Sequence, residues 1–321
     1  MDFVIVGAGA LGSILGAQLL SAGHSVVMLA RGARAEVLRR DGIRLHGLVE
    51  QQIPCRVETN PRAIKVADVL ILAVKTLTHE AAAQSLAHLQ VNIVLSVANG
   101  VLKNQQLINA FGEDHVLGCM ADLSGELKAD GRVHFTRNMC LHIGELHDQP
   151  SERCQSLVSK LNASGVNAAV ASDIRSVEWS KFVGWCPFMG LSVLSRVVSA
   201  RFLSDPDHAE VMVRAVREMY GLATVLGITI DDRSPLPVKT IATSAVADGV
   251  AAVLEMGARM REHAPEHRMS ALQDLRRGTP LEVEATLGHA TALGRQHDVP
   301  MPIMDTLYRL VAGVDRQNRQ V

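Results

Sequence analysis

Continuous apolar runs recur along the first third of the chain. They cover Phe3–Val6, Ser25–Leu29, Ala67–Val74 and Asn92–Val97. A run without polar alternation is typical of a strand buried on both faces of a parallel sheet. Between the runs the apolar residues recur at helical spacing, and these segments are Ala10–Ala22, Ala33–Arg40 and His79–Leu89. The alternation of strand and helix predicts an α/β fold with a doubly wound parallel sheet.

A second pattern follows, in which apolar and polar residues alternate over Val116–Asp122 and Arg132–Gly144. Alternation is typical of antiparallel strands with one solvated face, so we expect these strands at one edge of the sheet. Shorter elements are also predicted, and they are strands at Ile43–His46, Gln52–Cys55 and Asn167–Val170 and a helix at Glu152–Ser164.

From Asp173 onward the pattern is almost entirely helical. The predicted helices are Ile174–Ser199, Pro206–Leu226, Val238–Arg261, Leu281–His297 and Asp305–Gly313. A chain of 321 residues is long enough for two hydrophobic cores. We therefore expect an α/β domain over residues 1–172 and an all-helical domain over 173–321, with a ligand-binding cleft between them.

Three glycines follow the first strand with the spacing G-x-G-x-x-G. The first permits a tight turn, the second lets backbone approach a pyrophosphate, and the third lets the next helix pack closely on the strand. The turn leads into a helix and then a second strand, as a Rossmann-like βαβ unit requires. We predict that the turn binds a dinucleotide, and the predicted cofactor-binding residues are Gly7, Gly9, Ala10, Leu11 and Gly12.

Arg31 ends the second predicted strand, where an NAD site usually has an acidic residue for the ribose hydroxyls. A guanidinium at this place suits a 2′-phosphate through bidentate, charge-assisted hydrogen bonds. The sequence therefore favours NADPH over NADH as the cofactor. The alternative is that Arg31 is an ordinary solvated arginine.

Two further polar residues follow predicted strands, Lys75 after the run at 67–74 and Asn99 after the run at 92–97. In an open parallel sheet, ligands bind beyond the carboxyl ends of the strands. We therefore assign Lys75 and Asn99, together with Arg31, to the binding edge. Taken singly, Lys75 is equally well explained as a lysine that closes a strand, and Asn99-Gly100 as an ordinary turn.

Reduction by a nicotinamide cofactor also needs a proton donor for the oxygen that becomes negative. Lys181 is the candidate, because it lies in an otherwise apolar helical stretch with Phe182, Trp185 and Met189. Desolvation at such a position makes an ammonium a better proton donor near neutral pH. The alternative is a lysine whose stem lies along the surface while its ammonium reaches water.

Composition excludes several other classes of protein. The 32 basic and 33 acidic residues nearly cancel, which argues against binding to nucleic acid or anionic lipid. No apolar stretch is long enough for a membrane helix, and Asp2 stands where a signal peptide has basic residues. The five scattered cysteines indicate a reduced, cytoplasmic protein. His263 and His267 have no evident third ligand, so no metal site is expected.

A set of motifs then resembles one family along nearly the whole chain, the ketopantoate reductases (2-dehydropantoate 2-reductases). The motifs are VGAGALG at 6–12 with Ala30-Arg31-Gly32, Val74-Lys75-Thr76, Asn99-Gly100, Trp179-Ser180-Lys181, Ser270-Ala271-Leu272-Gln273-Asp274 and Leu281-Glu282-Val283-Glu284. The resemblance implies NADPH-dependent reduction of a 2-keto acid, with 2-dehydropantoate giving pantoate in pantothenate biosynthesis. It also implies site roles. Lys181 would donate the proton, Lys75 and Asn99 would line the nicotinamide and substrate side, Ser270 would hold the substrate carboxylate, and Glu282 would bind the substrate hydroxyl and position Lys181.

One departure from the family pattern concerns the substrate. The family usually has asparagines four and eight residues after this lysine, whereas this chain has Trp185 and Met189. That spacing keeps the three side chains on one side of a helix, so Trp185 and Met189 are predicted substrate contacts. Loss of two amides from a polar site favours a 2-keto acid with a more apolar tail as the alternative substrate.

A third hypothesis is a non-catalytic NADPH-binding sensor, which the joint presence of Lys181, Ser270 and Glu282 disfavours. The long apolar helices of the second domain are compatible with a homodimer and equally with an internal core.

Overall fold

The chain forms two compact units, Met1–Arg175 and Ser176–Val321, in a computed structural model that describes residues 1–147, 151–234 and 236–319. Sequence analysis divided the chain after residue 172. Helix α6 (Ile174–Ser195) begins in the last residues of the first unit and continues in the second.

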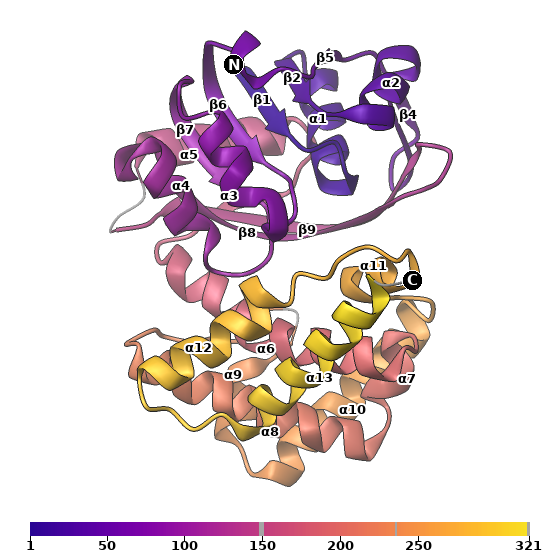
Figure 1. The fold of residues 1–321 in the computed structure, drawn as a ribbon, viewed down its shortest axis with the longest axis vertical. Helices are drawn as coiled ribbons and strands as arrows, with labels where there is room; N and C mark the ends of the chain where they lie inside the picture. Colours follow the sequence, from indigo (N-terminus) through magenta and orange to yellow (C-terminus); the bar gives the residue numbers. More distant parts are fainter. Residues whose placement is uncertain (148–150, 235, 320–321) are drawn as a thin grey trace. The chain divides into compact units, whose positions relative to one another are not determined.

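A five-stranded parallel sheet forms the centre of the first unit (Figure 1). Its strand order is β5-β2-β1-β6-β7, and the bounds are β1 (Asp2–Val6), β2 (Ser25–Leu29), β5 (Arg56–Glu58), β6 (Val66–Leu72) and β7 (Gln90–Ser96). All neighbouring strands in it run parallel. The predicted doubly wound α/β fold is confirmed.

Both faces of this sheet are buried, which explains why β1, β2, β6 and β7 are apolar without alternation, and only the short strand β5 is polar. Phe3 and Ile5 of β1 point into one hydrophobic core, whereas Val4 and Val6 point into another. Successive side chains of a strand point to opposite faces, so each face needs its own cover of helices. The helices of this region are α1 (Ala10–Ser21), α2 (Gly32–Asp41), α3 (Thr76–Ser85) and α4 (Lys103–Phe111).

The alternating strands belong to a second sheet, which corrects the expectation that they lie at one edge of the first. The order is β10-β9-β3-β4, with β8 antiparallel to β9. Its elements are β3 (Ile43–Gly47), β4 (Gln51–Ile53), β8 (Leu117–Leu127), β9 (Val133–Glu145) and β10 (Ala168–Val170), and α5 (Glu152–Ala163) follows β9. Helix α1 contacts strands of both sheets and is buried from Gly12 to Leu19. A helix buried on all sides needs a second apolar layer, and the second sheet supplies it.

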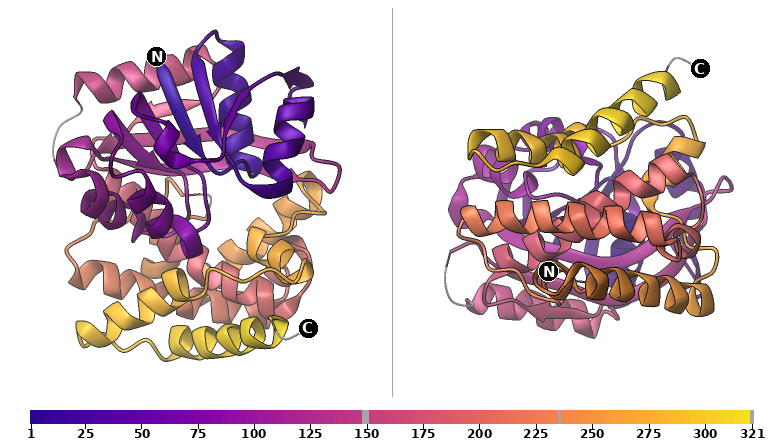
Figure 2. Two further views of the ribbon diagram at one scale, coloured as in Figure 1. Left: turned by 45° about the horizontal axis from the view of Figure 1, so that its top comes forward. Right: turned by 90° about the horizontal axis from the view of Figure 1, so that it is seen from below.

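The second unit is helical in the described residues. Its elements after α6 are α7 (Ser199–Leu203), α8 (Pro206–Val225), α9 (Val238–Thr243), α10 (Val246–His263), α11 (Ser270–Arg276), the π-helical turn η3 (Glu284–Gly288), α12 (His289–Gln296) and α13 (Pro302–Asn318). The right-hand view of Figure 2 shows α8 between α10 and α13, and α8 contacts both helices. Within the described residues, none of the helices is long and apolar enough to cross a membrane.

Several predicted helices end or begin elsewhere, among them those predicted at 79–89 and 305–313, which are α3 (Thr76–Ser85) and the longer α13 (Pro302–Asn318). Helix α6 stops at Ser195 because Arg196 adopts a left-handed conformation with φ +58°. The predicted helix at 238–261 is two helices, since Ser244 and Ala245 have extended backbone between α9 and α10. The predicted helix at 281–297 starts only at η3, so Glu282 lies in the non-helical segment before it.

Candidate active site

The glycine turn between β1 and α1 has the close backbone approaches that its spacing predicts. Gly7 has φ +96°, and a Cβ there would lie 2.7 Å from Val74 Cγ1. A Cβ on Gly12 would lie 2.0 Å from the carbonyl oxygen of Gly7. Gly9, by contrast, has no atom within 4 Å of the Cβ position, so a ligand can approach its backbone. Each glycine therefore meets a separate steric demand.

The end of α1 that follows the turn is suited to an anion. Gly9 is its N-cap, and Ala10, Leu11 and Gly12 form the first turn, which contains no acidic residue. The first amides of a helix have no carbonyl partner within it and carry its positive dipole end. These residues fit the pyrophosphate of a dinucleotide.

The register of the first sheet aligns four strand ends in one row. Leu29 pairs with Val6, Val6 with Leu72, and Leu72 with Ser96. We call these four residues the strand-end row. All four strands run in the same direction, so the segments after this row leave the sheet at one carboxyl edge.

The predicted binding residues of the first unit follow the strand-end row within a few positions. Arg31 is exposed and is the N-cap of α2, and Lys75 is exposed and is the N-cap of α3. Asn99 is half-buried and follows β7 directly before Gly100, whose φ is +82°. The glycine turn leaves the same edge after β1. The structure therefore brings Gly7, Gly9, Arg31, Lys75 and Asn99 to one edge of one sheet.

A buried hydrogen-bond network beneath Asn99 was not anticipated from the sequence. His79 of α3 donates from Nδ1 to Gln106 Oε1 at 2.7 Å and accepts at Nε2 from Ser96 Oγ at 2.8 Å. Ser96 Oγ also accepts from the amide of Ala98 at 3.2 Å. The pKa of His79 is lowered to about 4, mainly by burial and in smaller part by the positive charge of Lys103, while the hydrogen bond to Gln106 opposes the shift. This neutral ring fixes the backbone just before Asn99.

Lys103 holds the same segment from the other side. It is 4% exposed, and its Nζ donates to the carbonyl oxygen of Ala98 at 3.0 Å and to that of Cys119. The turn that carries Asn99 is thus held by α3, α4 and β8 together.

In the second unit, two serines position the part of α6 that carries Lys181. Ser176 Oγ donates to the carbonyl oxygen of Thr229 at 2.5 Å, and the amide of Asp231 donates to Ser180 Oγ at 3.0 Å. Both serines are buried, whereas Lys181 and Trp185 are half-buried. The spacing of four residues places Lys181 and Trp185 on one side of α6.

Met189 lies inside the second unit. It has no exposed surface, and Thr286 Oγ1 lies 3.6 Å from its sulfur. The single hydrogen of this hydroxyl is best placed on the carbonyl oxygen of Glu282, 2.5 Å away, and the contact with the Met189 sulfur is the weaker one, so Thr286 connects α6 to the segment that carries Glu282. Contact of Met189 with substrate would require it to leave this packing.

Ser270 begins α11, and Glu282 lies in the non-helical segment that follows this helix. Glu282 is 8% exposed, and the preceding amide, that of Leu281, donates to Asp315 Oδ1 at 2.8 Å. Ser270 is exposed and is the first residue of α11. The bond from Leu281 to Asp315 fixes the backbone directly before Glu282.

Glu178 is a further buried carboxylate that sequence analysis did not select. It is 6% exposed and precedes Lys181 by three residues on α6, so the two residues face the same side of the helix. The signal in the sequence was a glutamate placed three residues before a lysine in an otherwise apolar helix.

Among the described residues, no group of three or more His, Cys, Asp and Glu side chains could hold a metal ion.

Comparisons with known proteins cover both units. Residues 3–148 match the family model Ketopantoate reductase PanE/ApbA, and residues 173–315 match Ketopantoate reductase PanE/ApbA C terminal. The 2-dehydropantoate 2-reductase of Archaeoglobus fulgidus is 29% identical over 97% of both chains. A PanE/ApbA family ketopantoate reductase structure from Ralstonia eutropha has a TM-score of 0.84 at 24% identity and covers 99% of this chain and 100% of its own. D-mandelate dehydrogenase with NADH and anilino(oxo)acetate has a TM-score of 0.87 at 20% identity, with 99% of both chains covered.

Proposed function

Because the chain belongs to the ketopantoate reductase family, we propose that it reduces the keto group of a 2-keto acid with NADPH. The first substrate to test is 2-dehydropantoate, whose reduction to pantoate is a step of pantothenate biosynthesis. The observation that carries the proposal is the strand-end row, from which the glycine turn, Arg31, Lys75 and Asn99 leave at one edge.

The residues of the first unit bind and orient the cofactor. When bound, NADPH supplies the hydride. The backbone of Gly9 and the first amides of α1 hold its pyrophosphate, and the guanidinium of Arg31 pairs with the 2′-phosphate. Lys75 and Asn99 line the nicotinamide and substrate side.

The residues of the second unit orient the substrate and handle the proton. Lys181 donates a proton to the carbonyl oxygen as that oxygen gains negative charge. Ser270 holds the substrate carboxylate through its hydroxyl. Glu282 accepts a hydrogen bond from the substrate hydroxyl and orients the ammonium of Lys181. In a site sheltered from water, these preoriented groups stabilise developing charge more strongly than water does.

A second candidate is a more apolar 2-keto acid, and Trp185 favours it. The indole is half-buried one helical turn after Lys181, where it offers an apolar wall instead of an amide. D-mandelate dehydrogenase, which shares the fold, is described with NADH and an aromatic oxoacetate. An aryl or branched alkyl tail suits Trp185 better than a hydroxyl does.

A panel assay separates these candidates. NADPH oxidation is followed by absorbance with 2-dehydropantoate, pyruvate and phenylglyoxylate, each at several concentrations. The highest kcat/KM with 2-dehydropantoate supports the first candidate, and the highest with phenylglyoxylate supports the second. Tight NADPH binding without turnover of any 2-keto acid would instead support a non-catalytic sensor.

The catalytic role of Lys181 is tested in the same assay. Lys181→Ala removes the proton donor, so we expect kcat to fall by about a hundredfold or more while NADPH still binds. Lys239→Ala, a substitution on α9 of the same unit, is the control and should keep normal kcat. Near-normal turnover of Lys181→Ala would remove this residue from the mechanism.

The proposal extends to a homodimer formed through the helical unit. The ketopantoate reductase of Staphylococcus aureus, which shares the fold, is described as dimeric. Light scattering on the purified protein measures the mass directly, and a monomer at micromolar concentration would contradict the extension.

A further inference from the structure

We propose that Arg34 is a positioning residue for the glycine turn and that it supports the binding of NADPH and NADH equally. The inference rests on the proposed function, because it assumes that the glycine turn binds a dinucleotide. The two neighbouring arginines then have different roles, because Arg31 binds the 2′-phosphate and Arg34 holds the backbone of the glycine turn.

The guanidinium of Arg34 bonds two segments that are far apart in sequence, the glycine turn with the start of α1 and the loop between β8 and β9. Its Nε donates to the carbonyl oxygen of Ala8 in the glycine turn at 2.8 Å, and its Nη2 donates to Ser13 Oγ in the first turns of α1 at 2.9 Å. Its Nη1 donates to the carbonyl oxygen of Gly131 in the loop between β8 and β9 at 2.8 Å. Each of the three guanidinium nitrogens therefore donates one hydrogen bond to the protein.

Ser13 completes the contact with the turn. It is fully buried, and its hydroxyl donates to the carbonyl oxygen of Ala8 at 3.2 Å. Ala8 thus accepts from both Arg34 and Ser13, directly before Gly9, the residue that is open to a ligand. The peptide plane between Ala8 and Gly9 is therefore held by two side chains, one from α1 and one from α2.

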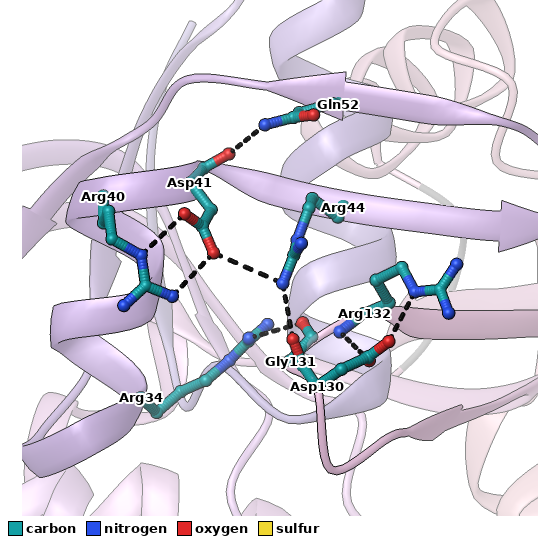
Figure 3. Close-up of polar contacts among 8 residues, drawn as sticks. All are labelled: Arg34, Arg40, Asp41, Arg44, Gln52, Asp130, Gly131 and Arg132. Carbon is teal, nitrogen blue, oxygen red and sulfur yellow. Dashed lines mark hydrogen bonds and ion pairs between the residues drawn. The ribbon is translucent and has the colours of Figure 1, made fainter.

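The loop on the far side of Arg34 is itself well fixed. Figure 3 shows Arg44 of β3 reaching the carbonyl of Asp130, next to the Gly131 carbonyl that Arg34 reaches. Arg132 pairs with the Asp130 carboxylate at 2.6 Å, and the amide of Gly131 donates to the carbonyl oxygen of Lys128 at 3.0 Å. Arg34 consequently connects the glycine turn to a loop that has hydrogen bonds and an ion pair of its own.

The guanidinium of Arg34 also acts through its charge. Desolvation lowers the pKa of Arg34 from its usual value, yet a guanidinium remains charged at neutral pH in proteins. Its partners are neutral oxygens, so a positive charge lies beside the turn. That charge attracts the pyrophosphate, which NADPH and NADH share.

The test compares dissociation constants of both cofactors for the full-length protein by fluorescence titration, without substrate. Arg34→Gln keeps a polar group but loses the charge and two of the three bonds. We expect the Kd values of NADPH and NADH to rise together by about tenfold, with their ratio unchanged. Arg34→Lys, which keeps the charge but cannot bond three acceptors at once, should fall between wild type and Arg34→Gln.

Two controls define the outcome. Arg31→Gln should weaken NADPH alone, and Arg40→Gln, at an exposed arginine of the same helix that pairs with Asp41, should change neither Kd. Thermal unfolding of each variant is recorded, and if Arg34→Gln does not fold, Ser13→Ala is used instead. That variant removes one of the two donors to Ala8 and should raise both Kd values by about threefold.

Three results would overturn the inference. Unchanged Kd values in Arg34→Gln or Ser13→Ala would show that the hydrogen bonds to the Ala8 carbonyl do not contribute to cofactor binding. Loss of NADPH affinity alone in Arg34→Gln would make Arg34 a ligand of the 2′-phosphate. A lowered melting temperature with unchanged Kd values in the folded variant would leave Arg34 a purely structural role. Failure of the proposed function looks different, since the wild-type protein would then bind neither cofactor or would bind without turnover.

Discussion

Protonation of His79 should destabilise the folded protein in mild acid. The ring is fully buried and neutral, with a pKa of about 4 against an ordinary value of 6.5. The unfolded chain therefore takes up a proton at a pH where the folded chain does not. This contribution to stability is fully present above about pH 6.5 and is lost as the pH falls toward about 4.

The magnitude follows from these two pKa values. Each pKa unit corresponds to about 1.4 kcal/mol, so moving from about pH 7 to about pH 4.5 removes about 2.5 kcal/mol of unfolding free energy through this one residue. Burial of the ring is the main cause of the lowered pKa, and a proton added at Nε2 would also force the Ser96 hydroxyl to find another acceptor.

Urea unfolding at both pH values measures the effect in wild type and in His79→Gln. Other groups titrate in this range too, so the quantity of interest is the difference in pH dependence between the two proteins. His79→Gln should be less stable at neutral pH but should lose about 2.5 kcal/mol less than wild type on acidification. His263→Gln, at an exposed histidine, should behave like wild type. An equal pH dependence in wild type and His79→Gln would refute the reasoning.

Four further predictions concern the two units. Arg31→Ala should reduce the preference for NADPH over NADH by about tenfold or more in kcat/KM, and an unchanged preference would remove Arg31 from the 2′-phosphate site. Gly12→Ala places a methyl group against the Gly7 carbonyl and should abolish NADPH binding in titrations and lower Tm, whereas normal affinity would contradict the close approach. Trp185→Asn restores the amide usual in the family, so kcat/KM for 2-dehydropantoate should rise relative to phenylglyoxylate, and a fall in that ratio would count against Trp185 as the selecting wall. Asp315→Ala leaves the buried Leu281 amide unpaired and should lower the unfolding free energy by about 1–3 kcal/mol in urea titrations, with no change expected for Glu262→Ala at an exposed carboxylate of α10.

The amino-acid sequence alone was sufficient for the glycine turn and for four of the five strands of the first sheet, β1, β2, β6 and β7, whereas β5 was not predicted. Strands buried on both faces must be apolar at every position, and a turn that approaches other backbone atoms closely must use glycine. Both demands are local, so they can be read from a short window such as 3–12. The position of Arg31 after β2 follows in the same way from the length of one strand.

Tertiary structure decided the rest, because it depends on partners distant in the chain. The strands β8 and β9 alternate as edge strands do, yet they form a second sheet, since α1 is buried all round and needs a second apolar layer. Helix α6 is apolar on most sides, so its pattern could not show that Met189 points inward while Trp185 stays half-buried. The sequence does not distinguish Arg34 from Arg31. In the structure, Arg34 donates to the carbonyl oxygens of a turn 26 positions earlier and a loop 97 positions later. A residue's type sets which bonds it can make, and the packing of remote segments sets which bonds it does make.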